Sequence, residues 1–157
     1  METSNFIIIT SINNPTEAIL KCSLLPDYKV IVVGDVKSPI LYDCPGVDFL
    51  SVNDQKLLAF KIPGMLPLNH YSRKMVGYLV AIQNGARRIV DTDDDNIPYD
   101  DWDFPEFDGI YEAVKEGSGF INIYKAFSDQ HIWPRGLPLR LINDRSNLDP
   151  LLVRTDC

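Results

Sequence analysis

Short apolar runs alternate with helical segments along the first ninety or so residues of this chain. The runs at 6–10, 29–33 and 88–90 are rich in β-branched residues, and each is followed by a polar loop. A briefer run at 47–51 is a fourth candidate strand. Because strands that alternate with helices build parallel sheets, the sequence predicts an α/β fold with a mainly parallel sheet.

Three segments between these strands are predicted to be helical. The segment 16–24 begins at Thr16, a residue type that caps helix N-termini, and Pro26 follows its end. The segment 54–60 is a second candidate helix.

The segment 69–84 has the clearest helical pattern. We expect Asn69 to cap its N-terminus and Gly85 to stop it. The side chains that recur at helical spacing, and that we therefore expect to face the core, are those of Met75, Leu79 and Ile82.

The polar loops that follow three of the strands indicate a binding site. In open α/β sheets, ligands bind outside the carboxyl ends of the strands. The loops after Ile9, Val33 and Val90 would open on this same edge. We therefore expect a ligand site where these three loops meet.

The length and composition are those of one globular domain. The chain has 157 residues, of which 45% are apolar and 24% charged, so it can bury a normal core. The part from Ile97 onward is rich in proline and aromatic residues, which predicts an irregular but ordered segment. We therefore predict a single domain over residues 1–157.

The net charge and the apolar pattern exclude some classes of partner. A net charge of −7 argues against a general nucleic-acid binder, but one bound cation would still allow a nucleotide ligand. The three cysteines show no metal-ligand spacing. No apolar run reaches the roughly 18 residues of a membrane span, and no basic segment precedes the first strand. As it stands, the chain is expected to be cytoplasmic.

Four aspartates lie within five residues directly after the strand at 88–90: Asp91, Asp93, Asp94 and Asp95. Like charges this close raise one another's pKa values and oppose folding, and a divalent cation relieves the repulsion. Mg²⁺ or Mn²⁺ typically takes one or two protein carboxylates and completes its shell with substrate phosphates. The open alternative is a solvated acidic turn.

Two other metal-dependent sites fit the acidic cluster poorly. An EF-hand loop that starts at Asp91 needs glycine at its sixth position and glutamate at its twelfth. This chain has Asn96 and Trp102 there. A phosphatase of the haloacid dehalogenase type carries its nucleophilic aspartate on the first strand, whereas this cluster follows a late one.

Several motifs cover nearly the whole chain in a consistent order. They are VGDVKSP from Val33, NHYSRKMVGYL from Asn69, DDDN from Asp93, WPRGLPL from Trp133, NLDP from Asn147, and Arg154-Thr155. This ordered set resembles GT-A glycosyltransferases and, more closely, the STELLO-like family of glycosyltransferases. The resemblance implies a GT-A fold, Rossmann-like, in which the donor is a nucleotide sugar. STELLO-like relatives are anchored in the Golgi membrane.

The resemblance assigns the loops after the first two strands to the nucleotide. Thr10, Ser11 and Asn13 would touch the nucleoside, although all three also suit a simple turn. Asp35 would accept a hydrogen bond from the base, which favours a UDP-sugar because uracil carries an imide N–H. Lys37 would lean on the diphosphate.

The start of the long helix and the acidic cluster would hold the charged part of the donor. Arg73 is expected to meet an anion near the helix N-terminus, whereas Lys74 would point about 100° away. Asp93 and Asp94 are expected on the nucleotide sugar, and Asp93 and Asp95 on Mn²⁺ or Mg²⁺, with the register open by one residue.

The resemblance also implies a sugar pocket and an acceptor site. Trp133 and Arg135 could shape the sugar pocket, or form a rigid aromatic turn. The acceptor, a glycan, a protein or a lipid, is not identified, and no motif selects a catalytic base. Relatives continue beyond Cys157, so we expect the acceptor half of the fold to be incomplete here.

Three functions follow from these patterns. The preferred one is a metal-dependent glycosyltransferase, or its donor-binding portion. The second is a GT-A-like module that binds a nucleotide sugar or a partner without transfer. The third is a metal-dependent phosphohydrolase or nucleotidyltransferase.

Overall fold

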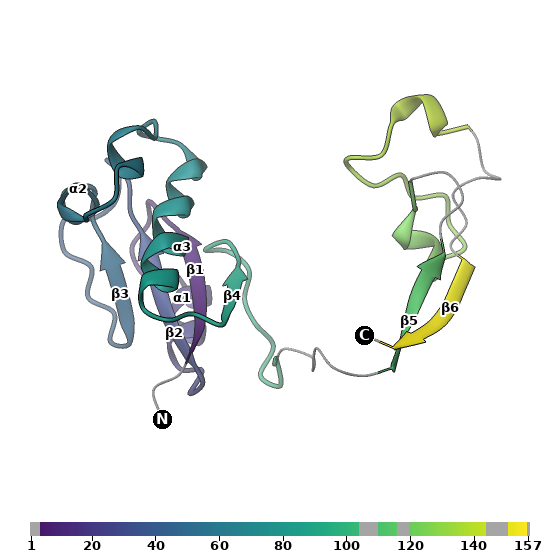
Figure 1. The fold of residues 1–157 in the computed structure, drawn as a ribbon, viewed down its shortest axis with the longest axis horizontal. Coiled ribbons are helices and arrows are strands. Elements are labelled where there is room, and N and C mark those ends of the chain that lie inside the picture. The colour runs from purple at the N-terminus through teal and green to yellow at the C-terminus, as the bar shows by residue number, and fades with distance from the viewer. Residues whose placement is uncertain (1–3, 104–109, 116–119, 144–150, 157) are drawn as a thin grey trace. The chain divides into compact units, whose positions relative to one another are not determined.

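The computed structural model describes residues 4–103, 110–115, 120–143 and 151–156 (Figure 1). Backbone contacts divide the chain into two compact units, Met1–Trp102 and Asp103–Cys157, and each is described by itself. Whether residues 1–157 act as one domain stays a prediction.

The first unit is built on a four-stranded parallel sheet with the strand order β3-β2-β1-β4. The strands are β1 (Asn5–Thr10), β2 (Tyr28–Val33), β3 (Val47–Leu50) and β4 (Arg88–Asp91). They coincide with the predicted runs within one residue at each end. The α/β fold with a parallel sheet is therefore confirmed, and its arrangement is that of a GT-A-like domain.

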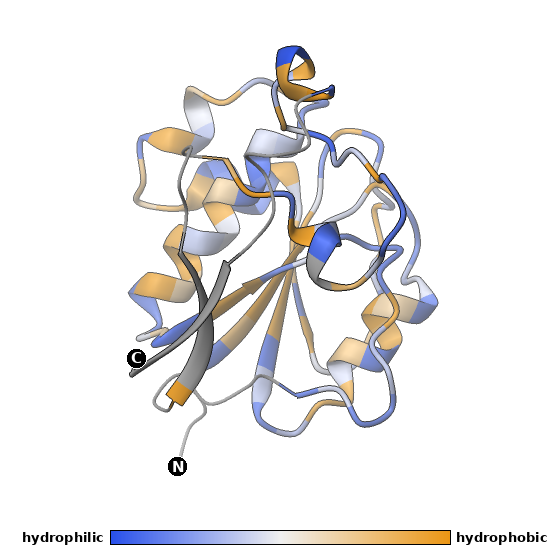
Figure 2. Cartoon of the chain, turned by 90° about the vertical axis from the view of Figure 1, so that its right-hand side faces the viewer, coloured by the Kyte–Doolittle hydropathy of each residue, from blue (hydrophilic) through white to orange (hydrophobic). Residues whose placement is uncertain are grey.

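The two central strands are buried on both faces, which explains why their sequences are continuously apolar. Ile7, Ile9 and Val32 pack on one face against Ile19 and Cys22 of the first helix. The side chains of the other face are those of Phe6, Ile8, Ile31 and Val33, and they pack against Val76 and Ala81 of the third helix. Figure 2 shows these strands as mainly hydrophobic ribbons.

Two short helices begin where the sequence places a capping residue. In α1 (Glu17–Ser23) the Thr16 hydroxyl accepts a hydrogen bond from the Ile19 N–H, as predicted. In α2 (Val52–Leu57) Ser51 and Asp54 form a capping box, so this helix begins two residues before the predicted segment.

The longest helix begins later than predicted. A 3₁₀ turn, Tyr71–Arg73, precedes α3 (Lys74–Gln83), and His70 caps the turn by accepting from the Ser72 N–H. Asn69 has a φ of 54°, so its expected role as helix cap was wrong. Gly85 ends the helix with a φ of 79°, as predicted.

The face that α3 turns to the sheet also differs from the prediction. Met75 and Ile82 are 47% and 59% exposed, whereas Val76, Gly77 and Ala81 are buried. A Cβ on Gly77 would lie 2.6 Å from Cγ2 of Ile8. Small residues therefore set the face on which α3 approaches the sheet, because only they allow this close contact.

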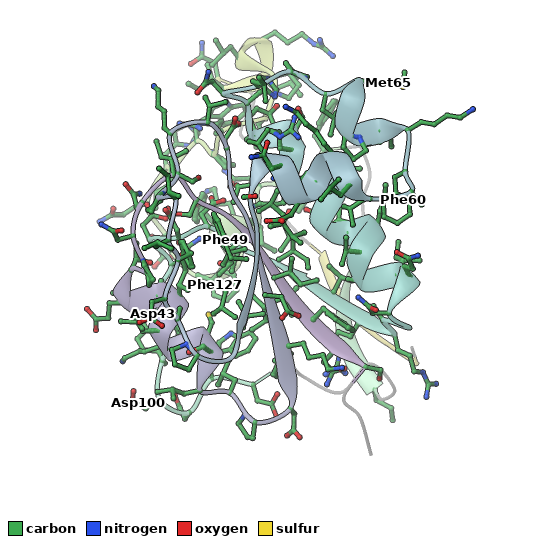
Figure 3. The ribbon with its side chains drawn as sticks, turned by 90° about the vertical axis from the view of Figure 1, so that its left-hand side faces the viewer. Asp43, Phe49, Phe60, Met65, Asp100 and Phe127 are labelled. Atoms are coloured by element: carbon green, nitrogen blue, oxygen red, sulfur yellow. The ribbon has the colours of Figure 1, made fainter. Side chains whose placement is uncertain are left out.

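The connection from α2 to α3 contributes Asn69 and His70 to a pocket at the carboxyl edge of the sheet. It contains a 3₁₀ turn, Ile62–Gly64, after which Met65 is exposed (Figure 3). The backbone carbonyl of Leu66 then accepts a hydrogen bond from Arg73.

The second unit contains an antiparallel pair, β5 (Ile110–Lys115) and β6 (Leu151–Asp156). Two 3₁₀ turns, Ile123–Ala126 and Leu139–Leu141, lie between them. The expectation that the segment from Ile97 onward is irregular was therefore wrong for β5 and β6. The motif at 147–150 lies outside the described residues. Among the residues that are described, no helix combines the length and apolar character needed to cross a bilayer.

Candidate functional site

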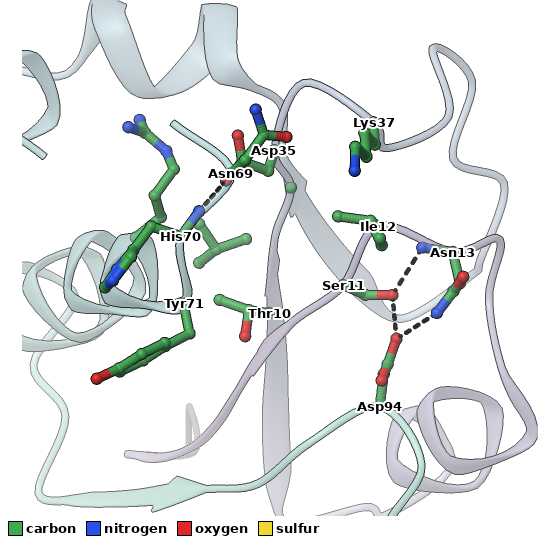
Figure 4. Close-up of a pocket in the computed structure, with 13 residues that line it drawn as sticks. Thr10, Ser11, Ile12, Asn13, Asp35, Lys37, Asn69, His70, Tyr71 and Asp94 are labelled. Atoms are coloured by element: carbon green, nitrogen blue, oxygen red, sulfur yellow. Dashed lines mark hydrogen bonds between the residues drawn. The ribbon is translucent and has the colours of Figure 1, made fainter. Parts of the chain in front are cut away.

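A cavity of about 290 Å³ lies at the carboxyl ends of β1 and β2 (Figure 4). Its lining comes from the loops after β1, β2 and β4 and from the start of the turn before α3. The lining residues are Thr10, Ser11, Ile12, Asn13, Val33, Gly34, Asp35, Lys37, Asn69, His70, Tyr71, Arg73 and Asp94. The expected convergence of three loops on one edge of the sheet is thus confirmed.

Asp94 joins the acidic cluster to the loop after β1. The Ser11 hydroxyl donates to Oδ2 of Asp94 at 2.5 Å, and the side-chain amide of Asn13 donates to the same oxygen at 2.9 Å. The Thr16 hydroxyl donates to the Asp94 carbonyl at 2.5 Å. These bonds turn Asp94, and not Asp93, toward the pocket.

Asp35 stands on the opposite wall, at the end of β2. Its Oδ1 accepts from the Val36 N–H at 2.8 Å and its Oδ2 from the His70 N–H at 3.1 Å. Burial raises the pKa of Asp35, but the backbone N–H groups of Asn69, Val36 and His70, together with the positive charge of Arg73, bring that pKa below its usual value. The carboxylate is therefore charged at neutral pH, and both oxygens already hold protein donors.

Ser38 ties the first two loops together. Its hydroxyl accepts from the Asp35 N–H at 2.8 Å and donates to the Ser11 carbonyl at 2.7 Å. Lys37, one residue before it, is exposed and lines the pocket. The position of Lys37 is compatible with its predicted contact to a diphosphate.

Arg73 lines the pocket but is only 2% exposed. Its Nε and Nη2 donate to Oε1 of Gln55 at 2.9 and 2.5 Å, and its Nη1 donates to the Leu66 carbonyl at 3.2 Å. The guanidinium group therefore supports the pocket wall in this structure. Its predicted contact with a ligand anion stays a prediction.

Gln55 completes this buried network. It has no exposed surface, and its side-chain N–H₂ group donates to the carbonyls of Gly34 and Leu50 at 2.8 Å each. Gln55 thus connects the ends of β2 and β3 to Arg73. Sequence reasoning missed it, because a glutamine in a short helix is usually exposed.

Lys74 lies in the acidic cluster. Its Nζ donates to Oδ1 of Asp91 at 2.6 Å, to the Thr92 carbonyl at 2.8 Å and to Oδ1 of Asp93 at 3.0 Å. The Tyr78 hydroxyl donates to Oδ2 of Asp91 at 2.5 Å. Arg73 and Lys74 therefore reach different parts of the site, one the pocket wall and the other the cluster.

The charged groups of this cluster shift one another's pKa values. Burial lowers the pKa of Lys74, but Asp91 and Asp93 raise it above its usual value. Burial raises the pKa of Asp91, and Lys74 and Tyr78 bring it below the usual value. Burial, followed by the contact with Asp91, raises the pKa of Tyr78. Each group consequently keeps its usual charge near neutral pH.

Part of the acidic cluster is open to solvent. The carboxylate of Asp95 is exposed, and Oδ2 of Asp93 makes no hydrogen bond to the described part of the chain. Within that part, no three His, Cys, Asp or Glu side chains are grouped as ligands of one ion. Asp93 and Asp95 are both exposed to solvent. Their role as metal ligands stays a prediction.

Trp133 and Arg135 belong to the second unit. Trp133 is half-buried and its ring lies 6.1 Å from that of His131, while Arg135 is exposed. Neither residue is among the described lining residues of the pocket, and their contribution to a sugar site stays a prediction.

Two aromatic residues of the pocket were not among the predicted site residues. The rings of His70 and Tyr71 stack 4.5 Å apart, and Tyr71 is 80% exposed. The signal for them was present, because both directly precede the long helix within the motif that starts at Asn69.

Comparison with known proteins gives two relatives, although no family model matches the sequence. They are the Arabidopsis thaliana proteins named "Probable glycosyltransferase STELLO1" and "Probable glycosyltransferase STELLO2", each 30% identical to this chain. The matches cover 91% and 90% of this chain but only 20% of each relative. The chain thus spans about a fifth of the length of the curated relatives it matches.

Proposed function

Since this chain is related to the STELLO-like family over 91% of its length, we propose that it binds the nucleotide-sugar donor of a glycosyltransferase. The donor is a UDP-sugar, and its binding depends on Mn²⁺ or Mg²⁺. The observation that carries this proposal is the pocket at the carboxyl edge of the sheet, which Ser11 and Asp94 line on one wall and Asp35 on the opposite wall.

One part of the pocket suits a nucleoside. Thr10, Ser11 and Asn13 supply hydroxyl and amide groups that can bond ribose and base. The exposed ring of Tyr71 supplies a flat face on which a base can stack. Asp35 supplies the negative charge that favours the imide N–H of uracil.

Another part suits a diphosphate. Lys37 lines the pocket with an exposed ammonium group. Asp93 and Asp95 do not line it, but they flank Asp94 in the chain and would offer carboxylate oxygens to a divalent ion. When bound, the ion supplies Lewis-acid stabilisation of the charge that develops on the leaving diphosphate. The acidic cluster and Lys37 would therefore hold the donor at its reactive end.

Titration calorimetry of UDP into the purified chain tests this proposal. With Mn²⁺ present we expect binding, and with EDTA or in Asp95→Ala we expect the affinity to fall by about tenfold or more, on the order of 1.4 kcal/mol. Asp94→Asn removes the charge that orders Ser11 and Asn13, and should weaken binding as well. Asp48→Asn makes the same change at an exposed position on β3 and should leave binding unchanged.

The outcomes separate the competing functions. If UDP does not bind under any metal condition, with GDP and CDP as comparisons, the nucleotide-sugar proposal fails for this chain. If UDP binds but UDP-sugars are not turned over, the binding-module function is favoured instead. Release of phosphate or pyrophosphate without sugar transfer would favour a hydrolase or nucleotidyltransferase.

A further inference from the structure

We propose that Lys74 is the resident cation of the acidic loop, which we define as Asp91–Asp95. In this inference the ammonium group on α3 holds Asp91 and Asp93 and orders the loop without a divalent ion. Lys74 is thus a positioning residue for the metal ligands. The inference rests on the proposed function only where it concerns the metal.

The contacts of Lys74 match the donors of its ammonium group. The group carries three N–H donors and meets three acceptors, Asp91 Oδ1 at 2.6 Å, the Thr92 carbonyl at 2.8 Å and Asp93 Oδ1 at 3.0 Å. The Lys74 side chain is 12% exposed, whereas those of Asp91 and Asp93 are 56% and 69% exposed. The lysine therefore reaches the loop from within the protein, while the aspartates stay open to solvent.

A second donor on the same face of α3 reinforces this arrangement. Tyr78 lies one helical turn after Lys74, so both side chains project toward the end of β4. Its hydroxyl takes the oxygen of Asp91 that Lys74 leaves free. Asp91 is thus bound through both oxygens to α3, which fixes the start of the loop.

The other side of the loop is fixed by neutral donors. Ser11 and Asn13 hold the Asp94 carboxylate, and Thr16 holds its carbonyl. Among the aspartates of the loop, only Asp95 is left without a hydrogen bond or ion pair to the described part of the chain. The loop thus reaches an ordered state in which one carboxylate is fully available.

This arrangement has a consequence for metal binding. Asp93 and Asp95 would hold the divalent ion, and because the ammonium group of Lys74 already contacts Oδ1 of Asp93 at 3.0 Å, the two positive charges would repel each other. Lys74 therefore orders the loop but weakens its affinity for a divalent ion in the absence of nucleotide. The phosphates of the nucleotide sugar add negative charge. They would offset this repulsion and raise the affinity for the divalent ion.

The test compares Lys74→Met with Lys21→Met. Lys21 makes a surface ion pair with Asp100, whose side chain is 96% exposed, so this control removes the same charge from a solvated pair. Thermal unfolding is recorded in EDTA, and Mn²⁺ affinity is measured by electron paramagnetic resonance of the free ion, without nucleotide.

We expect Lys74→Met to lower the melting temperature in EDTA by about 3–6 °C, while Lys21→Met changes it little. We also expect Lys74→Met to bind Mn²⁺ more tightly than the control, a direction that mere structural damage would not produce. Equal melting temperatures for the two variants, or an unchanged or weaker Mn²⁺ affinity in Lys74→Met, would overturn the inference.

If Lys74→Met is hard to obtain folded, Asp91→Asn in the natural sequence keeps the proposal testable, because it should lower the melting temperature in EDTA while the exposed control Asp48→Asn should not. Where Lys74→Met does fold, the two backgrounds are compared. In the natural sequence Asp91→Asn should lower the melting temperature, but in combination with Lys74→Met it should raise it, because it then relieves repulsion. The same sign in both backgrounds would contradict the role of the lysine. If none of the proteins binds Mn²⁺, the metal part of the proposed function fails, and the measurements in EDTA still decide the role of Lys74.

Discussion

Gln55 is fully buried, and its side chain connects the residues that support the pocket wall. Its amide group donates to two strand-end carbonyls and its oxygen accepts twice from Arg73. These bonds satisfy polar groups that burial would otherwise leave unpaired, at a cost of about 1–3 kcal/mol for each neutral group. The pocket wall formed by Arg73 therefore depends on Gln55.

We predict that Gln55→Leu lowers the free energy of unfolding by about 3 kcal/mol or more, because Nε and Nη2 of the buried Arg73 lose their acceptor and the Gly34 carbonyl loses its donor. The Leu50 carbonyl keeps the Gly34 N–H, and Nη1 of Arg73 keeps the Leu66 carbonyl. Urea denaturation measures the change. Gln83→Leu makes the same substitution at the exposed end of α3 and should change stability by less than about 0.5 kcal/mol. Similar effects of the two substitutions would show that the buried network contributes little.

Neighbouring residues of the acidic cluster have different roles in the structure. Asp94 binds the loop after β1, while Asp93 binds Lys74 on α3. The sequence pattern predicted a donor site at this cluster but left its register open by one residue. Only the positions of Ser11, Asn13 and Lys74 in space decide which aspartate faces the pocket.

Among the elements, α3 packs tightly against the sheet at Gly77. Gly77 lies where a Cβ would be 2.6 Å from Cγ2 of Ile8 and 2.8 Å from Cγ2 of Val33. Both contacts are shorter than side chains tolerate, so the helix could not approach in this way with a larger residue. The approach in turn brings Lys74 and Tyr78 of α3 to the end of β4.

We predict that Gly77→Ala destabilises the protein by about 1–3 kcal/mol, although alanine is the better helix former by roughly 1 kcal/mol. The overlap with Ile8 and Val33 outweighs the gain in helix propensity. Thermal or urea unfolding gives the change. In Gly64→Ala the new methyl group meets no atom within 4 Å, so its stability should be unchanged or slightly higher. A stabilised Gly77→Ala protein would mean that α3 shifts at little cost.

At the scale of the whole molecule, the pocket belongs to one unit. All thirteen lining residues lie within Met1–Trp102, and so do the four parallel strands and both faces of their core. This unit therefore contains all the residues to which the proposed UDP and metal contacts are assigned.

We predict that a fragment of residues 1–102 folds cooperatively and binds UDP with Mn²⁺ as well as the full chain does, within about threefold (roughly 0.65 kcal/mol). Circular dichroism during thermal unfolding and calorimetry of both proteins measure this. The full chain with Gln55→Leu serves as a comparison for damage to the pocket wall. A fragment that folds but has lost UDP binding would place necessary residues in the second unit.

The sequence by itself determined the strands, the capped α1 helix, the order of elements and the edge of the sheet where the loops meet. These features depend on local patterns, such as apolar runs, capping residues and the alternation of element types. Such patterns can be recognised from residues that are neighbours in the sequence. The motifs also predicted the resemblance to the STELLO-like family. The comparison confirms this resemblance over 91% of the chain.

The tertiary structure alone decided the buried face of α3, the hydrogen-bond partners of Arg73 and Lys74, and the separate roles of Asp93 and Asp94. Helical spacing favoured the larger Met75 and Ile82, but close packing at Gly77 turned the smaller Val76 and Ala81 to the sheet. The partners of these charged groups come from residues up to 83 positions away in the chain, so no local pattern contains them.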